Sequence, residues 1–94
     1  MEFGYYNATI TVNFVDGYSV KINDCVGIDI RDDCLMFKSF YDPVVLVDTC
    51  SAKRHITWYV HTIGFNEAES CYYVDLRYVS ELFILPGYHF CNNT

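Results

Sequence analysis

Apolar and polar residues alternate along the first 22 residues of the chain, which is the pattern of half-buried β-strands. In the first segment the apolar positions are Tyr6, Ala8, Ile10, Val12 and Phe14. In the second segment they are Tyr18, Val20 and Ile22. A two-residue Asp-Gly loop between the segments would place Val12 opposite Lys21 and would mix the two faces.

A three-residue loop instead brings all of these apolar side chains to one face. The loop consists of Val15, Asp16 and Gly17. The pattern therefore predicts a hairpin with a type I turn and a G1 bulge at Gly17. The predicted cross-strand pairs are Phe14 with Tyr18, Val12 with Val20 and Ile10 with Ile22.

A second hairpin is predicted around the adjacent aspartates Asp32 and Asp33, since aspartate tolerates the backbone angles of a tight turn. Before this turn the apolar positions alternate at Val26, Ile28 and Ile30. After it, Leu35 and Phe37 return on the same face. The ladder is expected to end at Asp42-Pro43, because proline cannot donate a hydrogen bond to it.

The middle of the chain predicts two further strands between polar loops. Residues 44–47 are all apolar, as in a strand that is covered on both faces. Residues 55–63 alternate again. One face of this strand would carry Ile56, Trp58 and Val60, and the other His55, Thr57, Tyr59 and His61.

The last quarter of the chain predicts short strands and at most two turns of helix. Alternation at Tyr72, Val74 and Leu76 indicates a strand. The segment from Asp75 to Leu82 is a candidate helix, with Asp75 as its N-cap. Residues 82–85 form a short apolar strand, residues 86–87 a Pro-Gly turn, and residues from 88 onward a last edge strand.

These elements predict a single all-β domain over residues 1–94. Seven or eight short strands at close spacing are typical of an antiparallel β-meander. The meander is expected to form a small sandwich, or else a strongly bent sheet or open barrel. With 52% hydrophobic residues, the chain is too apolar to be disordered.

The formal net charge of −6 limits the kinds of partner that the chain can bind. Direct binding to DNA or RNA needs surplus lysine and arginine, and so does docking on anionic lipid. We therefore expect no direct nucleic-acid partner and no membrane. No targeting segment or membrane span is recognisable, and the expected location is the cytoplasm.

Reactive groups gather in one stretch, residues 50–55, where Cys50 precedes Lys53, Arg54 and His55. The two cations could lower the pKa of the thiol. We interpret the stretch instead as a basic loop with an incidental cysteine, because a nucleophile and its base normally come from separate segments of a chain. Since no known catalytic motif occurs, we expect a protein that is not an enzyme.

Metal donors are present, but their spacing does not match a zinc site. They are His55, His61, His89, Cys71 and Cys91. The five cysteines are an odd number, which fits a disulfide framework poorly. No metal and no cofactor are expected.

Charge and tyrosine content give the clearest functional indication. Residues 24–48 carry six aspartates against Arg31 and Lys38, which makes the second hairpin and its flanks acidic. The chain also has nine tyrosines, more than we expect a small core to enclose. Tyrosine beside carboxylates is typical of protein-binding surfaces. The alternative is that a second sheet, as in a sandwich, covers the face that carries these tyrosines.

In size, acidity, paired hairpins at Asp16-Gly17 and Asp32-Asp33, and lack of enzyme motifs, the chain resembles small proteins of phages and mobile elements. Anti-CRISPR proteins are among them. The resemblance implies an inhibitor in the host cytoplasm that blocks or mimics nucleic acid on a basic, nucleic-acid-binding complex. The predicted partner-binding residues are Asp29, Asp32, Asp33, Tyr41, Asp42, Tyr59 and Tyr73.

Two other functions stay open at this point. The chain could be a structural subunit that assembles as a homodimer or larger homo-oligomer through edge strands and tyrosine faces. It could instead bind a small anionic ligand such as a nucleotide. The residues for that ligand would be Lys53, Arg54, His55 and Trp58.

Overall fold

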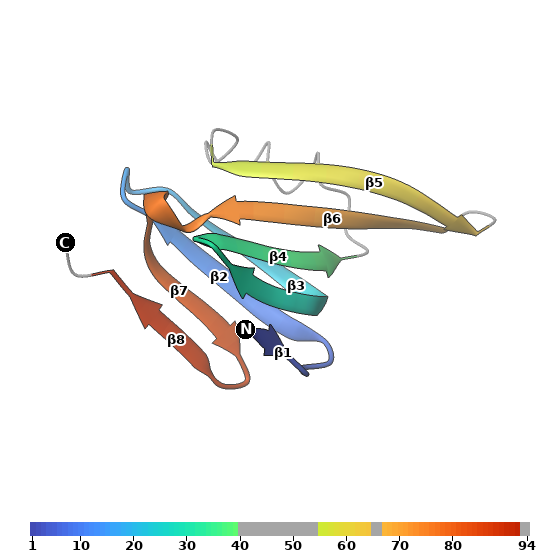
Figure 1. Ribbon diagram of the computed structural model, residues 1–94, viewed down its shortest axis with the longest axis horizontal. Coiled ribbons are helices and arrows are strands. Elements are labelled where there is room, and N and C mark those ends of the chain that lie inside the picture. Colours follow the sequence, from blue (N-terminus) through green and yellow to red (C-terminus); the bar gives the residue numbers. More distant parts are fainter. Residues whose placement is uncertain (40–54, 65–66, 93–94) are drawn as a thin grey trace.

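The computed structural model describes residues 1–39, 55–64 and 67–92, and these form one antiparallel sheet (Figure 1). Its eight strands are β1 (Glu2–Phe3), β2 (Ala8–Phe14), β3 (Ser19–Arg31), β4 (Cys34–Ser39), β5 (Ile56–Gly64), β6 (Glu67–Asp75), β7 (Val79–Leu85) and β8 (Tyr88–Cys91). The predicted all-β, antiparallel fold is thus confirmed. The predicted strand within residues 44–47 lies outside the described residues.

The strand order is β5-β6-β4-β3-β2-β7-β8, with β1 paired to β3. Strands β2 to β4 are neighbours in chain order, as in a meander. The β5–β6 hairpin then joins beside β4, and the β7–β8 hairpin joins beside β2. At these two places the order differs from that of a simple meander.

Strand β3 runs through both halves of the sheet and bends between them (Figure 1). Its first part pairs with β2, and its last part pairs with β1 and β4. Asp24 and Gly27 lie at the bend with φ of 56° and 61°, in the left-handed region that a bulge uses. We call the part with β2, β7 and β8 the β2 half, and the part with β4, β5 and β6 the β4 half.

The bend brings the apolar faces of the two halves into one core. The β2 half contributes fully buried residues such as Ile10, Val12 and Leu82. From the β4 half, Phe37 and Tyr72 stack with their ring centroids 5.0 Å apart. Of the predicted arrangements, the protein therefore forms the strongly bent sheet, and the sheet is not closed into a barrel.

The first hairpin has the predicted turn. Gly17 has φ of 94°, and its N–H donates to the Phe14 carbonyl over 3.0 Å. The Phe14 N–H donates to the Tyr18 carbonyl over 2.7 Å. The predicted pairs further along the ladder, Ile10 with Ile22 and Val12 with Val20, are also formed.

The outermost tyrosines of that pattern do not join the core. Tyr6 is 89% exposed, because Asn7 turns the chain with φ of 55° and β2 begins only at Ala8. Tyr18 lies beside the turn and is also exposed. Placing both on the buried face was wrong, since alternation alone does not show where a strand begins.

The second hairpin turns through Asp32 and Asp33, as predicted, with φ of 50° and 61°. The apolar pattern before it is only partly correct. Ile28 is buried, but Val26 and Ile30 are half-buried and Cys25 is buried in their place. The bulge near Gly27 shifts the alternation, so that residues three apart face the core.

The candidate helix is a single 3-10 turn, Leu76–Tyr78, capped by Asp75 as predicted. Its predicted extension to Leu82 was wrong, because that residue lies in β7 and pairs with Val12. The alternation at Tyr72, Val74 and Leu76 is confirmed, and so is the edge strand after the Pro-Gly turn. No helix in the described part of the chain is long and apolar enough to cross a membrane.

Candidate functional site

The outer face of the β4 half brings two predicted binding residues, Tyr59 and Tyr73, next to each other. Strand β6 pairs with β4 on one side and β5 on the other, so that Met36, Tyr73 and Thr57 form one row across the sheet. Tyr72 and Val74 point into the core, so Tyr73 between them points outward. We define the tyrosine face as Asp32, Asp33, Thr57, Tyr59 and Tyr73.

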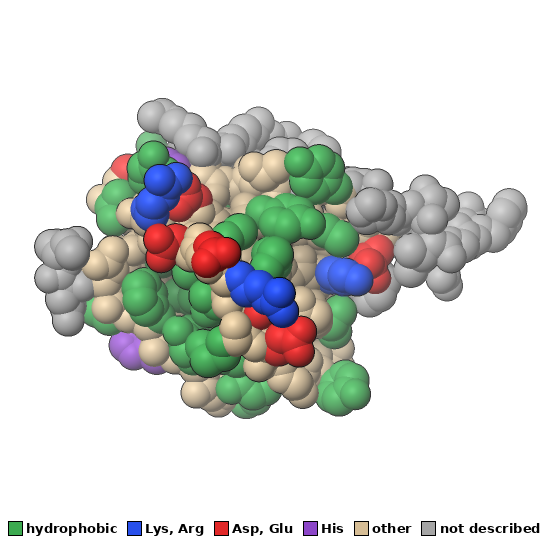
Figure 2. Space-filling model, viewed as in Figure 1, with side chains coloured by type: hydrophobic (Ala, Val, Ile, Leu, Met, Phe, Trp, Pro, Cys, Tyr) green, Lys and Arg blue, Asp and Glu red, His purple; other side chains and the backbone are tan. Residues whose placement is uncertain are grey.

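The two tyrosines of this face leave a large part of their rings in water. Tyr59 is 56% exposed and Tyr73 is 37% exposed. Their rings meet edge to face with centroids 5.7 Å apart, which is a favourable aromatic geometry. In Figure 2, hydrophobic side chains occupy the middle of the described surface, with acidic and basic side chains around them.

A hollow of about 440 Å³ opens beside Tyr73, and the predicted residues Asp32 and Asp33 line it. The Asp33 carbonyl accepts a hydrogen bond of 2.9 Å from the Leu76 N–H, which fixes the turn against the 3-10 helix. No hydrogen bond or ion pair holds either aspartate side chain within residues 1–39, 55–64 and 67–92. The charge of Asp33 still acts on Arg77, whose pKa it raises.

Asp75 and Arg77 also line the hollow, but they bind each other. The Arg77 guanidinium donates to both carboxylate oxygens of Asp75, over 3.0 and 2.7 Å. These hydrogen bonds lower the pKa of Asp75 and raise that of Arg77. Because this pair is neutral overall, the remaining charge of the hollow is that of Asp32 and Asp33.

The thiol in the hollow is poorly suited to nucleophilic chemistry. Burial raises the pKa of Cys34, and the charge of Asp75 raises it further. Burial also raises the pKa of Cys25 in the core, to about 12. Both cysteines therefore stay protonated near neutral pH, and only the thiolate is a good nucleophile.

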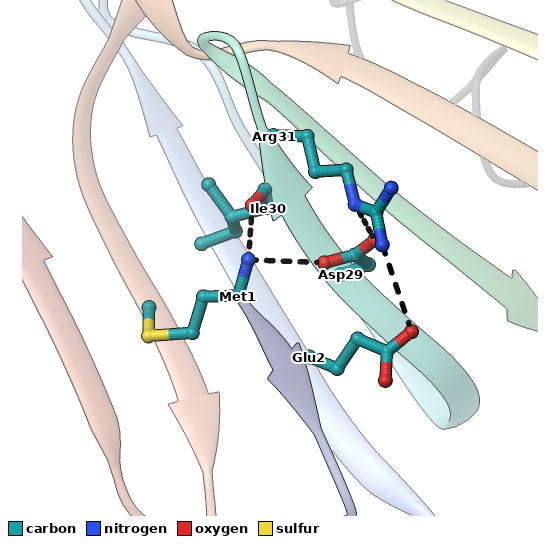
Figure 3. A network of polar contacts seen from close by, with 5 residues as sticks. All are labelled: Met1, Glu2, Asp29, Ile30 and Arg31. Atoms are coloured by element: carbon teal, nitrogen blue, oxygen red, sulfur yellow. Dashed lines mark hydrogen bonds and ion pairs between the residues drawn. The ribbon is translucent and has the colours of Figure 1, made fainter.

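Asp29, a third predicted binding residue, is engaged inside the molecule (Figure 3). Its carboxylate lies 3.2 Å from the Met1 amino group and 2.7 Å from Nε of Arg31. Only 16% of its side chain is exposed. Asp29 lines a separate hollow of about 250 Å³, which also borders Tyr73. Asp29 is therefore not a free carboxylate on the same surface as Asp32 and Asp33.

His55, predicted from the sequence as a ligand-binding residue, is packed between aromatic rings. It stacks on Tyr78 with centroids 4.6 Å apart and lies 5.1 Å from the Phe14 ring. Its Nε2 is 3.1 Å from an Asp16 carboxylate oxygen, and this hydrogen bond lowers the pKa of Asp16. With 11% of its side chain exposed, His55 links β5 to the first hairpin.

The remaining predicted residues cannot be placed on this face. Tyr41, Asp42, Lys53 and Arg54 lie outside the described residues, as do Cys50 and the side chains of Trp58 and His61. Among the described residues, no group of three or more His, Cys, Asp or Glu side chains could hold a metal ion. His89 is instead paired with Glu81 over 2.8 Å.

The sequence reasoning missed the pairing of Asp75 with Arg77, although it identified the aspartate as a helix cap. An arginine two residues after a capping aspartate is the available signal for this pair. Comparison with protein-family models, curated proteins and solved structures finds no match to this chain.

Proposed function

We propose that this chain is a non-enzymatic binding module that docks a basic protein on its tyrosine face. The observation that carries the proposal is the exposed pair Tyr59 and Tyr73. Tyr73 lies beside two carboxylates that make no hydrogen bond or ion pair with the described residues. Tyrosine offers a large, rigid and amphipathic contact area, and it is enriched among residues that dominate binding energy.

The chemistry of the face favours arginine on the partner. A guanidinium can stack on an aromatic ring while its planar fork donates to a carboxylate. The Tyr73 ring and the carboxylates of Asp32 and Asp33 offer both contacts around one hollow. Tyr59 extends the aromatic part across a neighbouring hollow that it shares with Tyr73. Asp29 and Asp75 are already paired with cations, which leaves fewer carboxylates for the partner. The two tyrosines therefore contribute more to the binding energy than the remaining carboxylates do.

The finer part of the proposal concerns the partner's own role. A basic surface that accepts carboxylates in this way commonly accepts phosphates as well. We propose that the partner is a nucleic-acid-binding complex of the host and that the chain inhibits it by occupying that site. The net charge of −6 and the resemblance to anti-CRISPR-type proteins support this part.

The proposal is tested by capturing the partner from the native host with tagged protein. The test variant is Tyr59→Thr with Tyr73→Thr, because threonine keeps a high strand propensity while it removes both rings. The control is Tyr6→Thr, which removes an equally large ring that is 89% exposed outside the face.

We expect the wild type and the control to retain the same partner, identified by mass spectrometry, and the double variant to lose it. Binding of the purified partner should weaken at least about 30-fold, since a residue pair of this kind contributes about 2 kcal/mol or more. Equal retention by all three proteins would refute a binding role for this face. A captured protein without affinity for nucleic acid would refute only the finer part.

A further inference from the structure

The outer edge of β8 has the geometry to pair with another strand. Strand β8 lies at the margin of the sheet, and no further strand pairs beyond it among the described residues (Figure 1). The Asn92 N–H donates to the Ser80 carbonyl over 2.9 Å, and Leu82 lies opposite Phe90. Hydrogen-bonded and non-hydrogen-bonded pairs alternate along an antiparallel ladder. The N–H and C=O groups of Phe90 therefore face β7, and those of His89 point away from it.

The side chains of β8 leave this edge accessible and apolar on one side. The His89 ring is held back over β7, stacked on Phe83 at 4.6 Å and bonded to Glu81 at 2.8 Å. On the other side, Tyr88 and Phe90 are half-buried at the margin of the core. The strand contains no proline, lysine or bulge, the devices that usually protect an edge from pairing.

From these features we propose that the protein forms a two-fold symmetric dimer by antiparallel pairing of β8 with β8 of a second copy. Centred on His89, the two strands exchange N–H···O=C bonds between the His89 residues of both copies. The same register puts Tyr88 of each copy opposite Phe90 of the other. These are non-hydrogen-bonded positions, where side chains lie closest.

A second copy fits this edge better than an unrelated strand does. The edge is complementary to itself, because the aromatic residues on either side of His89 exchange places under the two-fold axis. The two half-buried rings of each copy would then be covered by the two rings of its partner. The tyrosine face belongs to the opposite margin of the sheet, so the dimer leaves both copies of it accessible.

The decisive variant is His89→Pro, which removes an N–H that points away from β7 and leaves the bonds between β7 and β8 in place. His89→Ala is the matched control, since it loses the same imidazole and keeps the N–H. Sedimentation and light scattering should be recorded from about 10 µM to about 1 mM, the range for a small interface. We expect wild type and His89→Ala to dimerise with rising concentration and His89→Pro to remain monomeric.

Amide exchange of the wild-type protein gives a second measurement that needs no variant. The His89 amide should exchange at least about tenfold more slowly in the dimer than in dilute protein, while the Phe90 amide, already bonded to β7, changes little. A wild type that stays monomeric up to about 1 mM would overturn the proposal. So would a dimer that forms equally with His89→Pro or leaves His89 exchange unchanged.

Discussion

The two halves of the sheet have very different outer faces. On the β2 half, short polar side chains bond one another across the strands, as in Thr9 with Asn23 at 3.2 Å and Asn13 with Glu81 at 3.5 Å. On the β4 half, Tyr59 and Tyr73 stand exposed in the corresponding positions. Both faces cover the same core, but the aromatic ring that β7 carries on the outer face of the β2 half, Phe83, is half-buried and stacked on His89. This difference agrees with the proposal that the tyrosines contact another molecule.

The sharpest test of this difference compares two neighbours in β6 of the same residue type. Tyr72 is fully buried against Phe37, and Tyr73 is on the outer face. Tyr72→Ala should lower the free energy of unfolding by about 3–5 kcal/mol, because it leaves a cavity in the core. Tyr73→Ala should lower it by less than about 1 kcal/mol.

Urea denaturation of both variants, followed by circular dichroism, measures these values. A loss for Tyr73→Ala as large as that for Tyr72→Ala would mean that the outer tyrosine is needed for folding. The contrast between the two outer faces would then have a purely structural explanation.

The charged part of the tyrosine face should have a smaller effect on binding. Replacing Asp32 and Asp33 together by asparagine keeps the turn, because asparagine also accepts a positive φ. Binding of the captured partner should weaken about three- to tenfold, and its dependence on salt should decrease.

Titration calorimetry at low and high salt measures both quantities. Lys21→Gln, which removes a charge from the outer face of the β2 half, is the matched control and should leave binding unchanged. Unchanged affinity and salt dependence in the aspartate variant would remove Asp32 and Asp33 from the binding surface.

The smallest expected effect is a pH dependence that comes from the Asp75–Arg77 pair. The hydrogen bonds from Arg77 lower the folded-state pKa of Asp75, so the ionised form stabilises the fold. This contribution is complete above the unfolded pKa of about 3.9 and is lost as the pH falls through the lower folded pKa.

Unfolding by urea should therefore show a smaller difference between wild type and Asp75→Asn at pH 2 than at pH 6. The asparagine side chain can still accept the hydrogen bond of the helix cap, so the comparison isolates the charge. A difference that is the same at both pH values would show that the ion pair adds nothing to stability.

Local features of this fold were predictable from the sequence, and distant pairings were not. The register of the first hairpin follows from which residues are apolar, because a shift by one residue would expose them all. The pairing of β6 with β4 and of β7 with β2 depends on contacts between distant segments. Hydrophobic alternation carries no information about such neighbours.

The candidate site was predictable to a similar extent. Asp32 and Asp33 follow from turn chemistry, and Tyr59 and Tyr73 from their place opposite the apolar stripe. Asp29 was assigned to the binding surface because it belongs to the acidic second hairpin. Its capture by Met1 depends on the pairing of β1 with β3, which brings together segments 29 residues apart.

The position of β7 has a consequence for biosynthesis. Its partner β2 leaves the ribosome well before residues 79–85 do. Until they emerge, one edge of β2 lacks its neighbour and the apolar side chains that Leu82 and Ile84 cover are accessible to other chains. A chain truncated before Val79 should therefore aggregate, and a growing chain stays vulnerable until β7 has emerged.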